Sequence, residues 1–221
     1  MPRNTVTNRV LNPEQQNLFL QSEVFSSASW GKINCTITAN TTTAPDGNLT
    51  ASSITESNSL NSTKLIYQFS TGVQLNSIVT ASYYMKKNTR DFGFIAKLNG
   101  GTVIAYAFFD LNNGIIGAYS TTGNILISVP IIETVGSGWY RCSATFYNAG
   151  NLIGVCSSSA NNTTSYVGSA GVQPIFIWGA NFNKGTAIPP YKSTLTTAYD
   201  AGNVHPKSAN KIIVSDRVLI T

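Results

Sequence analysis

The chain has 221 residues and a formal net charge of +5, yet only 10% of its residues are charged. So low a charged fraction is typical of extracellular or virion-exposed β proteins, since cytosolic enzymes usually carry about a quarter. The basic residues are dispersed and only Lys86, Lys87 and Arg90 form a tight group, so we expect solvated strand ends and not the concentrated basic stripe of a nucleic-acid site.

Residues 1–16 are polar and contain Pro2 and Pro13, which predicts an extended N-terminal arm, either disordered or docked on a neighbouring subunit. The start of the chain has no apolar core of a signal peptide, and no apolar run approaches transmembrane length. We therefore expect no membrane insertion. If the protein acts outside a cell, release in a virus particle by lysis is one route.

Strand signals recur about every ten residues, and no helical period of apolar residues is visible. Turn chemistry separates the strands at Pro45-Asp46-Gly47, Asn99-Gly100-Gly101 and Asn112-Asn113-Gly114. This pattern predicts an all-β, two-sheet antiparallel jelly-roll sandwich over residues 17–199. The expected strands are 33–39, 51–56, 64–70, 76–85, 92–98, 102–110, 115–119, 124–135, 139–146, 152–157 and 173–182.

The stretch 136–146 is the most amphipathic of these strands, because alternate side chains of a strand point to opposite faces. Tyr140, Cys142, Ala144 and Phe146 form the face that we expect to be buried. Trp139, Arg141, Ser143 and Thr145 form the other face, which we expect to meet water. Residues 173–182 are almost continuously apolar, which predicts a strand buried on both faces.

Residues 200–221 follow the sandwich as a separate C-terminal segment. They include the lone His205 and a β-rich apolar run at 211–220. Such a run could cap the domain or pair with another chain by edge addition, and we favour the intermolecular use.

Several segments, in order along the chain, resemble a module of tailed-bacteriophage virion proteins. The likeness spans residues 17–192 and includes Asn-Leu-Phe-Leu-Gln-Ser-Glu-Val-Phe at 17–25 and Gly-Trp-Tyr-Arg at 138–141. The other matching segments are 30–32, 44–51, 83–87, 109–114, 133–137 and 177–180, with Tyr191 at the end. The resemblance implies a carbohydrate-binding-module-like or concanavalin-like jelly roll of head fibres, tail fibres and decoration proteins. The chain departs from it at 181–183, where Asn-Phe-Asn replaces the frequent Gln-Leu-Glu.

Enzymatic chemistry has little support in the sequence. One histidine makes a serine triad or a His-rich metal site implausible. The carboxylates available for glycoside hydrolysis lie beside turns or strand ends, where structural roles are commoner; they are Glu23, Asp46, Glu56, Asp91, Asp110 and Glu133. The spacing of Cys35, Cys142 and Cys156 signals neither a disulfide framework nor a zinc site. We expect buried free thiols, with a Cys142–Cys156 bridge as the alternative.

Glycan binding would need an exposed aromatic platform with polar neighbours. The residues that we select for such a site are Trp30, Tyr83, Tyr119, Trp139 and Arg141, with Tyr106 and Tyr147 as further aromatics. Each of these aromatics could instead be an ordinary core or sheet-face residue, and we expect Trp178 to lie in the core. Calcium is conceivable at Asp46 and Asn48, but no dense acidic loop supports it, and we predict no metal or other cofactor.

The sequence therefore predicts a non-enzymatic virion structural protein, of the capsid decoration, head-fibre or tail-adaptor kind. Its jelly roll would face outward, and its two terminal segments would anchor it to capsid or tail proteins. We expect a homo-oligomer, a trimer, assembled in the host cytoplasm and carried on the virion. The alternatives are a carbohydrate-binding host-receptor module of a tail fibre, which would bind a host surface glycan, and a glycan-cleaving depolymerase.

Overall fold

The structure is a computed structural model that describes residues 16–57, 61–69, 71–120, 123 and 125–200. The N-terminal arm expected at 1–16 lies outside the described residues, apart from Gln16. The C-terminal segment expected at 200–221 also lies outside them, apart from Asp200.

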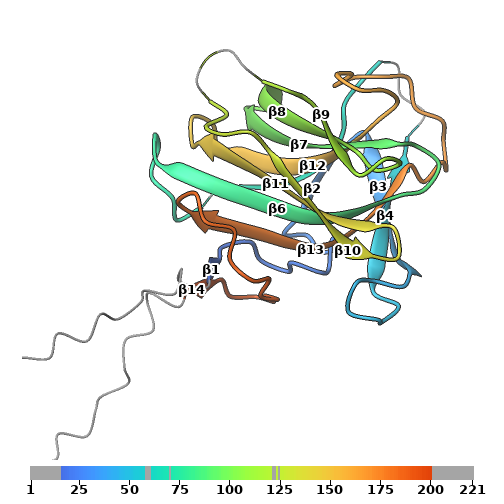
Figure 1. The fold of residues 1–221 in the computed structure, drawn as a ribbon, viewed down its shortest axis with the longest axis horizontal. Coiled ribbons are helices and arrows are strands. Elements are labelled where there is room, and N and C mark those ends of the chain that lie inside the picture. Colours follow the sequence, from blue (N-terminus) through green and yellow to red (C-terminus); the bar gives the residue numbers. More distant parts are fainter. Residues whose placement is uncertain (1–15, 58–60, 70, 121–122, 124, 201–221) are drawn as a thin grey trace, which may run out of the picture.

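Two six-stranded antiparallel sheets pack face to face as a sandwich (Figure 1). Sheet I has, in spatial order, β10 (Ile131–Gly136), β11 (Trp139–Tyr147), β6 (Ile78–Lys87), β13 (Ile175–Lys184), β4 (Ala51–Glu56) and β3 (Cys35–Thr42). Sheet II has β2 (Gly31–Ile33), β5 (Lys64–Phe69), β12 (Leu152–Ser158), β7 (Phe92–Asn99), β8 (Thr102–Asp110) and β9 (Ile115–Tyr119). The described residues contain no helix, and the predicted all-β two-sheet sandwich is confirmed.

The ends of the described chain pair with each other. Strand β1 (Gln16–Asn17) runs antiparallel to β14 (Tyr199–Asp200), with Gln16 opposite Asp200. The Gln16 side chain also accepts a hydrogen bond from the Lys184 N–H at the end of β13. Residues 16 and 200 therefore leave the sandwich side by side, next to sheet I (Figure 1).

Local alternation and turn chemistry placed most strands correctly, with two exceptions. The strand expected at 33–39 is interrupted at Asn34, whose φ of +53° is a left-handed conformation that asparagine tolerates. The chain changes sheet there, because β2 belongs to sheet II and β3 to sheet I. The strand expected at 124–135 begins only at Ile131, immediately after Pro130.

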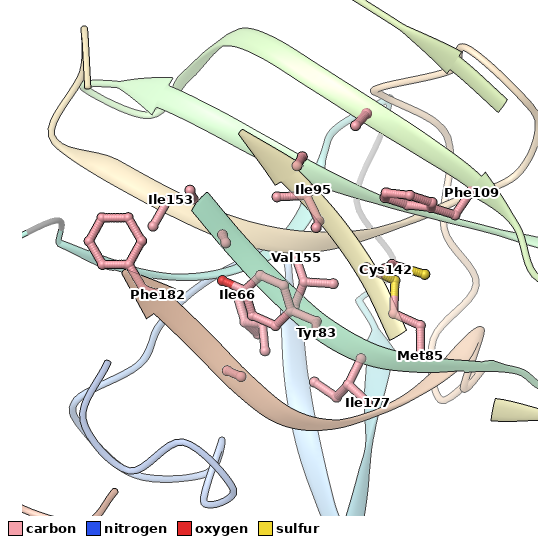
Figure 2. Close-up of a cluster of buried hydrophobic side chains, with 14 of the residues drawn as sticks. Ile66, Tyr83, Met85, Ile95, Phe109, Cys142, Ile153, Val155, Ile177 and Phe182 are labelled. Atoms are coloured by element: carbon pink, nitrogen blue, oxygen red, sulfur yellow. The ribbon is translucent and has the colours of Figure 1, made fainter. Parts of the chain in front are cut away.

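The main core lies between the two sheets (Figure 2). Sheet I contributes side chains such as Tyr83 and Phe182, and sheet II contributes side chains such as Ile95 and Phe109. Cys35, Cys142 and Cys156 are buried and free, as expected. Cys142 and Cys156 lie on strands of different sheets, so the alternative bridge is not formed.

Candidate functional site

The outer face of sheet I carries a group of buried polar side chains. Tyr83 and Cys142 point into the core, so their neighbours Tyr84 and Arg141 point outward. Strand register aligns the outward side chains in three rows across β11, β6 and β13. The rows are Arg141–Tyr84–Trp178, Ser143–Ser82–Asn181 and Thr145–Thr80–Asn183.

The register that forms these rows depends on a β-bulge in β13 between Trp178 and Asn181. Gly179 lies in this bulge with φ +56°, and a Cβ at this position would come within 2.8 Å of the Tyr84 ring. Only glycine satisfies both the left-handed backbone and this close approach.

Residues 185–194, which we call the covering segment, lie over these rows. The Arg141 Nη2 donates to the Pro189 carbonyl at 2.6 Å, and the Thr80 hydroxyl donates to the Gly185 carbonyl at 2.8 Å. The Tyr191 ring lies 5.0 Å from the Trp178 ring, between centroids. Strand β13 is consequently buried on both faces, as predicted.

The face of β11 that was expected to meet water is buried instead. Its members Trp139, Arg141, Ser143 and Thr145 are only 1, 8, 1 and 6% exposed. The expectation failed because amphipathic alternation identifies the face that is less apolar, not the face that is open. The covering segment lies over Arg141, and the loop after β3 contacts Trp139; both are far from β11 along the chain.

Four buried polar atoms on this face have no hydrogen-bond partner among the described residues. They are Arg141 Nε, Ser143 Oγ, Trp178 Nε1 and Asn181 Oδ1. An unpaired buried polar group costs about 1–3 kcal/mol in free energy of folding.

Beyond the first row, the same side of sheet I has a hollow of about 340 Å³, within the roughly 300–1,000 Å³ typical of small-molecule sites. The loop after β3, the β10–β11 turn and one residue of β6 form it. Its lining residues are Thr42, Thr43, Ala44, Pro45, Gly47, Lys86, Val135, Gly136, Ser137 and Trp139.

Trp139 fixes the shape of this hollow. Its indole N–H donates to the Thr43 carbonyl at 3.1 Å and thereby ties β11 to the 42–47 loop. The β10–β11 turn has left-handed backbone at Gly136, Ser137 and Gly138. A Cβ at Gly138 would lie 3.5 Å from Lys86 Cε, so the lysine side chain runs along this turn.

The residues that line the hollow therefore include one aromatic residue, three residues with a hydroxyl group and one lysine. This combination of an apolar surface and a few polar groups can hold a small polar molecule by hydrogen bonds and van der Waals contact. Lys86 and Ser137 were not among the residues selected from sequence, because nothing local indicates that residues 42–47, 86 and 135–139 meet.

The five residues selected from sequence for a glycan platform do not form one. Trp30 and Tyr83 are fully packed in the core, where their rings lie 6.3 Å apart. Trp139 is 1% exposed and Arg141 lies under the covering segment. Tyr119 is half-buried on β9, in the other sheet.

Of the two further aromatics, Tyr106 is half-buried and its hydroxyl donates to Asn162 at 2.7 Å, whereas Tyr147 is exposed at the end of β11. Replacing Trp30 or Trp139 with alanine would cost about 3–5 kcal/mol of stability. Such variants would not be clean tests of glycan binding.

The buried carboxylate Glu56, at the end of β4, is held by a complete set of partners. Both its oxygens accept from Arg90, at 2.5 and 3.0 Å, and the Tyr166 hydroxyl and Ser169 N–H donate to it at 2.6 and 2.8 Å. Burial raises the pKa of Glu56, but these hydrogen bonds outweigh burial, and the pKa lies below the ordinary value.

Asp110 and Asp46 shape local turns. Asp110 accepts from the N–H groups of Asn112 and Asn113, and Asp46 accepts from the N–H and side-chain amide of Asn48. Both oxygens of Asp46 are thus used within the turn where calcium was considered. Among the described residues, no three His, Cys, Asp or Glu side chains gather as a metal site. No helix within the same residues could span a membrane.

Comparison with known proteins adds little. No family model matches the sequence, and no curated protein matches it. Among solved structures, a "putative sugar binding protein" from Bacteroides thetaiotaomicron is similar at 12% identity and a TM-score of 0.35. The match covers 77% of this chain and 95% of the other.

Proposed function

We propose that the protein is a non-enzymatic structural component of a tailed-phage virion, with the sandwich displayed outward. The observation that supports this function is that the segments resembling phage virion proteins meet in space. The Tyr191 hydroxyl donates a hydrogen bond to Glu23 Oε1 at 2.9 Å and forms a second hydrogen bond with Ser22 Oγ, also at 2.9 Å. The Ala180 N–H of β13 donates to the Ser22 carbonyl at 2.9 Å.

Further contacts join the matching segments 44–51 and 138–141 to this group. Trp139, Trp178, Ala44 and Ala51 form one buried cluster, against which Tyr191 packs. Five widely separated matches, 17–25, 44–51, 138–141, 177–180 and Tyr191, thus meet at sheet I, as expected if they are parts of one inherited structural unit. The binding partners would then be other virion proteins, and the location would be the particle.

The pairing of β1 with β14 supports the proposed use of the two ends as anchors. Since Gln16 and Asp200 lie opposite each other, residues 1–15 and 201–221 start from the same place and can engage one partner surface. A homotrimer held by these segments would leave the opposite end of each sandwich facing outward.

This proposal can be tested on phage particles whose genome encodes the chain. Antibodies against the 16–200 sandwich should label intact particles in electron microscopy, and deletion of residues 1–15 or 201–221 should abolish incorporation. These limits keep the β1–β14 pair. In solution, light scattering of the full chain should give a mass of three times the 23.6 kDa of one chain. The chains that lack residues 1–15 or 201–221 should not give this trimeric mass. Particles without the chain would overturn the virion role, and a monomeric full chain would overturn the trimer.

Catalysis is not part of the proposal, because Glu56, Asp46 and Asp110 are each engaged in the contacts described above. We expect mass spectrometry to show that a bound glycan is not shortened after prolonged incubation with the protein. Shortened products would support the depolymerase alternative.

The hollow beside Trp139 favours a second function, binding of a host surface glycan. A glycan array probed with the full chain should show binding, and Ser137→Ala should weaken it because Ser137 lines the hollow. Ser29→Ala is the matched control, since Ser29 is exposed and does not line the hollow. An array without binding would overturn this second function and leave the virion role intact.

A further inference from the structure

We propose that the hollow between the 42–47 loop and the β10–β11 turn binds an anionic group carried on a sugar, either a carboxylate or a phosphate. This inference rests on the second function proposed above and specifies its ligand. It is carried by the charges of the residues in and around the hollow.

Lys86 supplies the positive charge. Its side chain lines the hollow and runs along Gly138, where a Cβ would meet Lys86 Cε at 3.5 Å and Cδ at 4.0 Å. Its neighbours across the sheet are Trp139 on β11 and Phe176 on β13. Lys86 therefore has an apolar cross-strand neighbour on each side, along which its stem can pack.

The other two cations of the 86–90 group already have carboxylate partners. Lys87 Nζ lies 2.6 Å from Asp91 Oδ1, and Arg90 Nε lies 2.5 Å from Glu56 Oε1. Within the described residues, Lys86 has no such ion pair. A half-buried cation that no carboxylate neutralises attracts anions more strongly than a solvated one.

The remaining lining residues favour an anion as well, because none of them is acidic. The nearby Asp46 is turned toward Asn48, which donates to it through both its N–H and its amide. Glu133 lies on β10 opposite Arg141. Arg141 belongs to the row next to that of Trp139, so Glu133 is not one of the residues that line the hollow. The hydroxyls of Thr42, Thr43 and Ser137 can donate to further ligand oxygens.

Three hexoses that differ only at C6 test the charge requirement: glucose, glucuronic acid and glucose 6-phosphate. Each is titrated into the isotope-labelled full chain up to about 10 mM, which reaches millimolar Kd values, while backbone amide shifts are followed by NMR. The expected result is saturable shifts around residues 42–47, 86 and 135–139 for an acidic sugar, with at least tenfold weaker binding of glucose. Preference between the two acids distinguishes a carboxylate ligand from a phosphate.

Lys86→Met and Lys86→Arg then separate charge from shape. The methionine variant keeps an unbranched apolar stem and should lose about tenfold in affinity for the preferred acid, whereas the arginine variant should retain most of it. Lys87→Met is the matched control, because the neighbouring Lys87 is paired with Asp91, and it should leave binding unchanged.

The possible outcomes distinguish this inference from the function on which it rests. Equal binding of glucose and the acids at the hollow, or array binding of neutral glycans only, overturns the anionic ligand and leaves glycan binding standing. Absence of array binding together with absence of hexose shifts overturns both. Unchanged affinity in Lys86→Met also overturns the inference, even where an acid binds.

Discussion

Two groups of buried polar side chains differ in how their hydrogen bonds are completed: one around Glu56, which connects β4 of sheet I with β5 and β12 of sheet II, and one formed by the outer-face rows of sheet I. In the group around Glu56, both carboxylate oxygens have two donors each. The cationic groups of Lys64 and Arg90 lie 4.4 and 4.7 Å from the centroid of the Tyr166 ring. Lys64 also donates to the Tyr166 carbonyl.

The outer-face rows below the covering segment are equally buried but incompletely paired. Ser143 Oγ and Asn181 Oδ1 have no partner among the described residues, and Arg141 uses Nη2 but not Nε. A buried polar group stabilises a fold only when its hydrogen bonds are made. We therefore expect the Glu56 group to stabilise the sandwich and the rows to contribute little or to cost stability.

The largest effect is expected for Glu56→Gln. Removal of the negative charge leaves Arg90 without its carboxylate and should cost about 3 kcal/mol in free energy of unfolding, measured by denaturant titration. Asp91→Asn is the control, because it breaks an exposed pair with Lys87 and should cost less than about 1 kcal/mol. Equal losses in the two variants would show that burial adds nothing to the Glu56 pair.

A pH series sharpens the same point. Because the pKa of Glu56 is lowered in the folded state, its stabilising effect is fully present above the pKa of an unfolded glutamate. It is lost as pH falls through the lower folded value. Unfolding free energy of the wild type should decline over this acidic range more steeply than that of Glu56→Gln. Parallel pH curves for the two proteins would contradict a lowered pKa.

A matched pair of serines compares the two regions directly. Ser157 Oγ lies 2.8 Å from the Tyr166 hydroxyl in the Glu56 group, so Ser157→Ala should cost about 1 kcal/mol, the usual value of one hydrogen bond. Thermal and denaturant unfolding both measure this loss. A neutral Ser157→Ala would mean that the Tyr166 contact does not stabilise the fold.

Ser143→Ala should have the smallest effect. Ser143 is as buried as Ser157, but its hydroxyl has no protein partner, so its removal should be neutral or slightly stabilising, by less than about 1 kcal/mol. The same unfolding measurements apply. A loss as large as that of Ser157→Ala would break the comparison and show that the Ser143 hydroxyl has a partner in solution.

Sequence patterns predicted most of the fold because strands and hairpins depend on neighbouring residues. Alternation located β4, β8 and β9, and the Asn-Gly and Gly-Gly turns placed the β7–β8 and β8–β9 hairpins. Prediction failed at Asn34, where one apparently continuous pattern serves two sheets. An alternating pattern contains no information on which sheet a strand joins.

The candidate site was predicted less well, for a related reason. Aromatic content suggested Trp30, Tyr83 and Trp139, all of which are buried, because large rings in a sandwich mostly fill its interior. Lys86 was interpreted as part of a solvated basic group. Only the fold shows that Lys87 and Arg90 are neutralised while Lys86 faces a hollow without carboxylates.

The sequence by itself determined the fold class and the positions of most strands, since these depend on composition and short-range periodicity. The tertiary structure decided which faces are open. Residues 185–194 cover the polar face of β11, and residues 42–47 meet the turn at 135–138. Both contacts join segments that are far apart along the chain, and the free energy of such packing depends on three-dimensional shape, which no local pattern encodes.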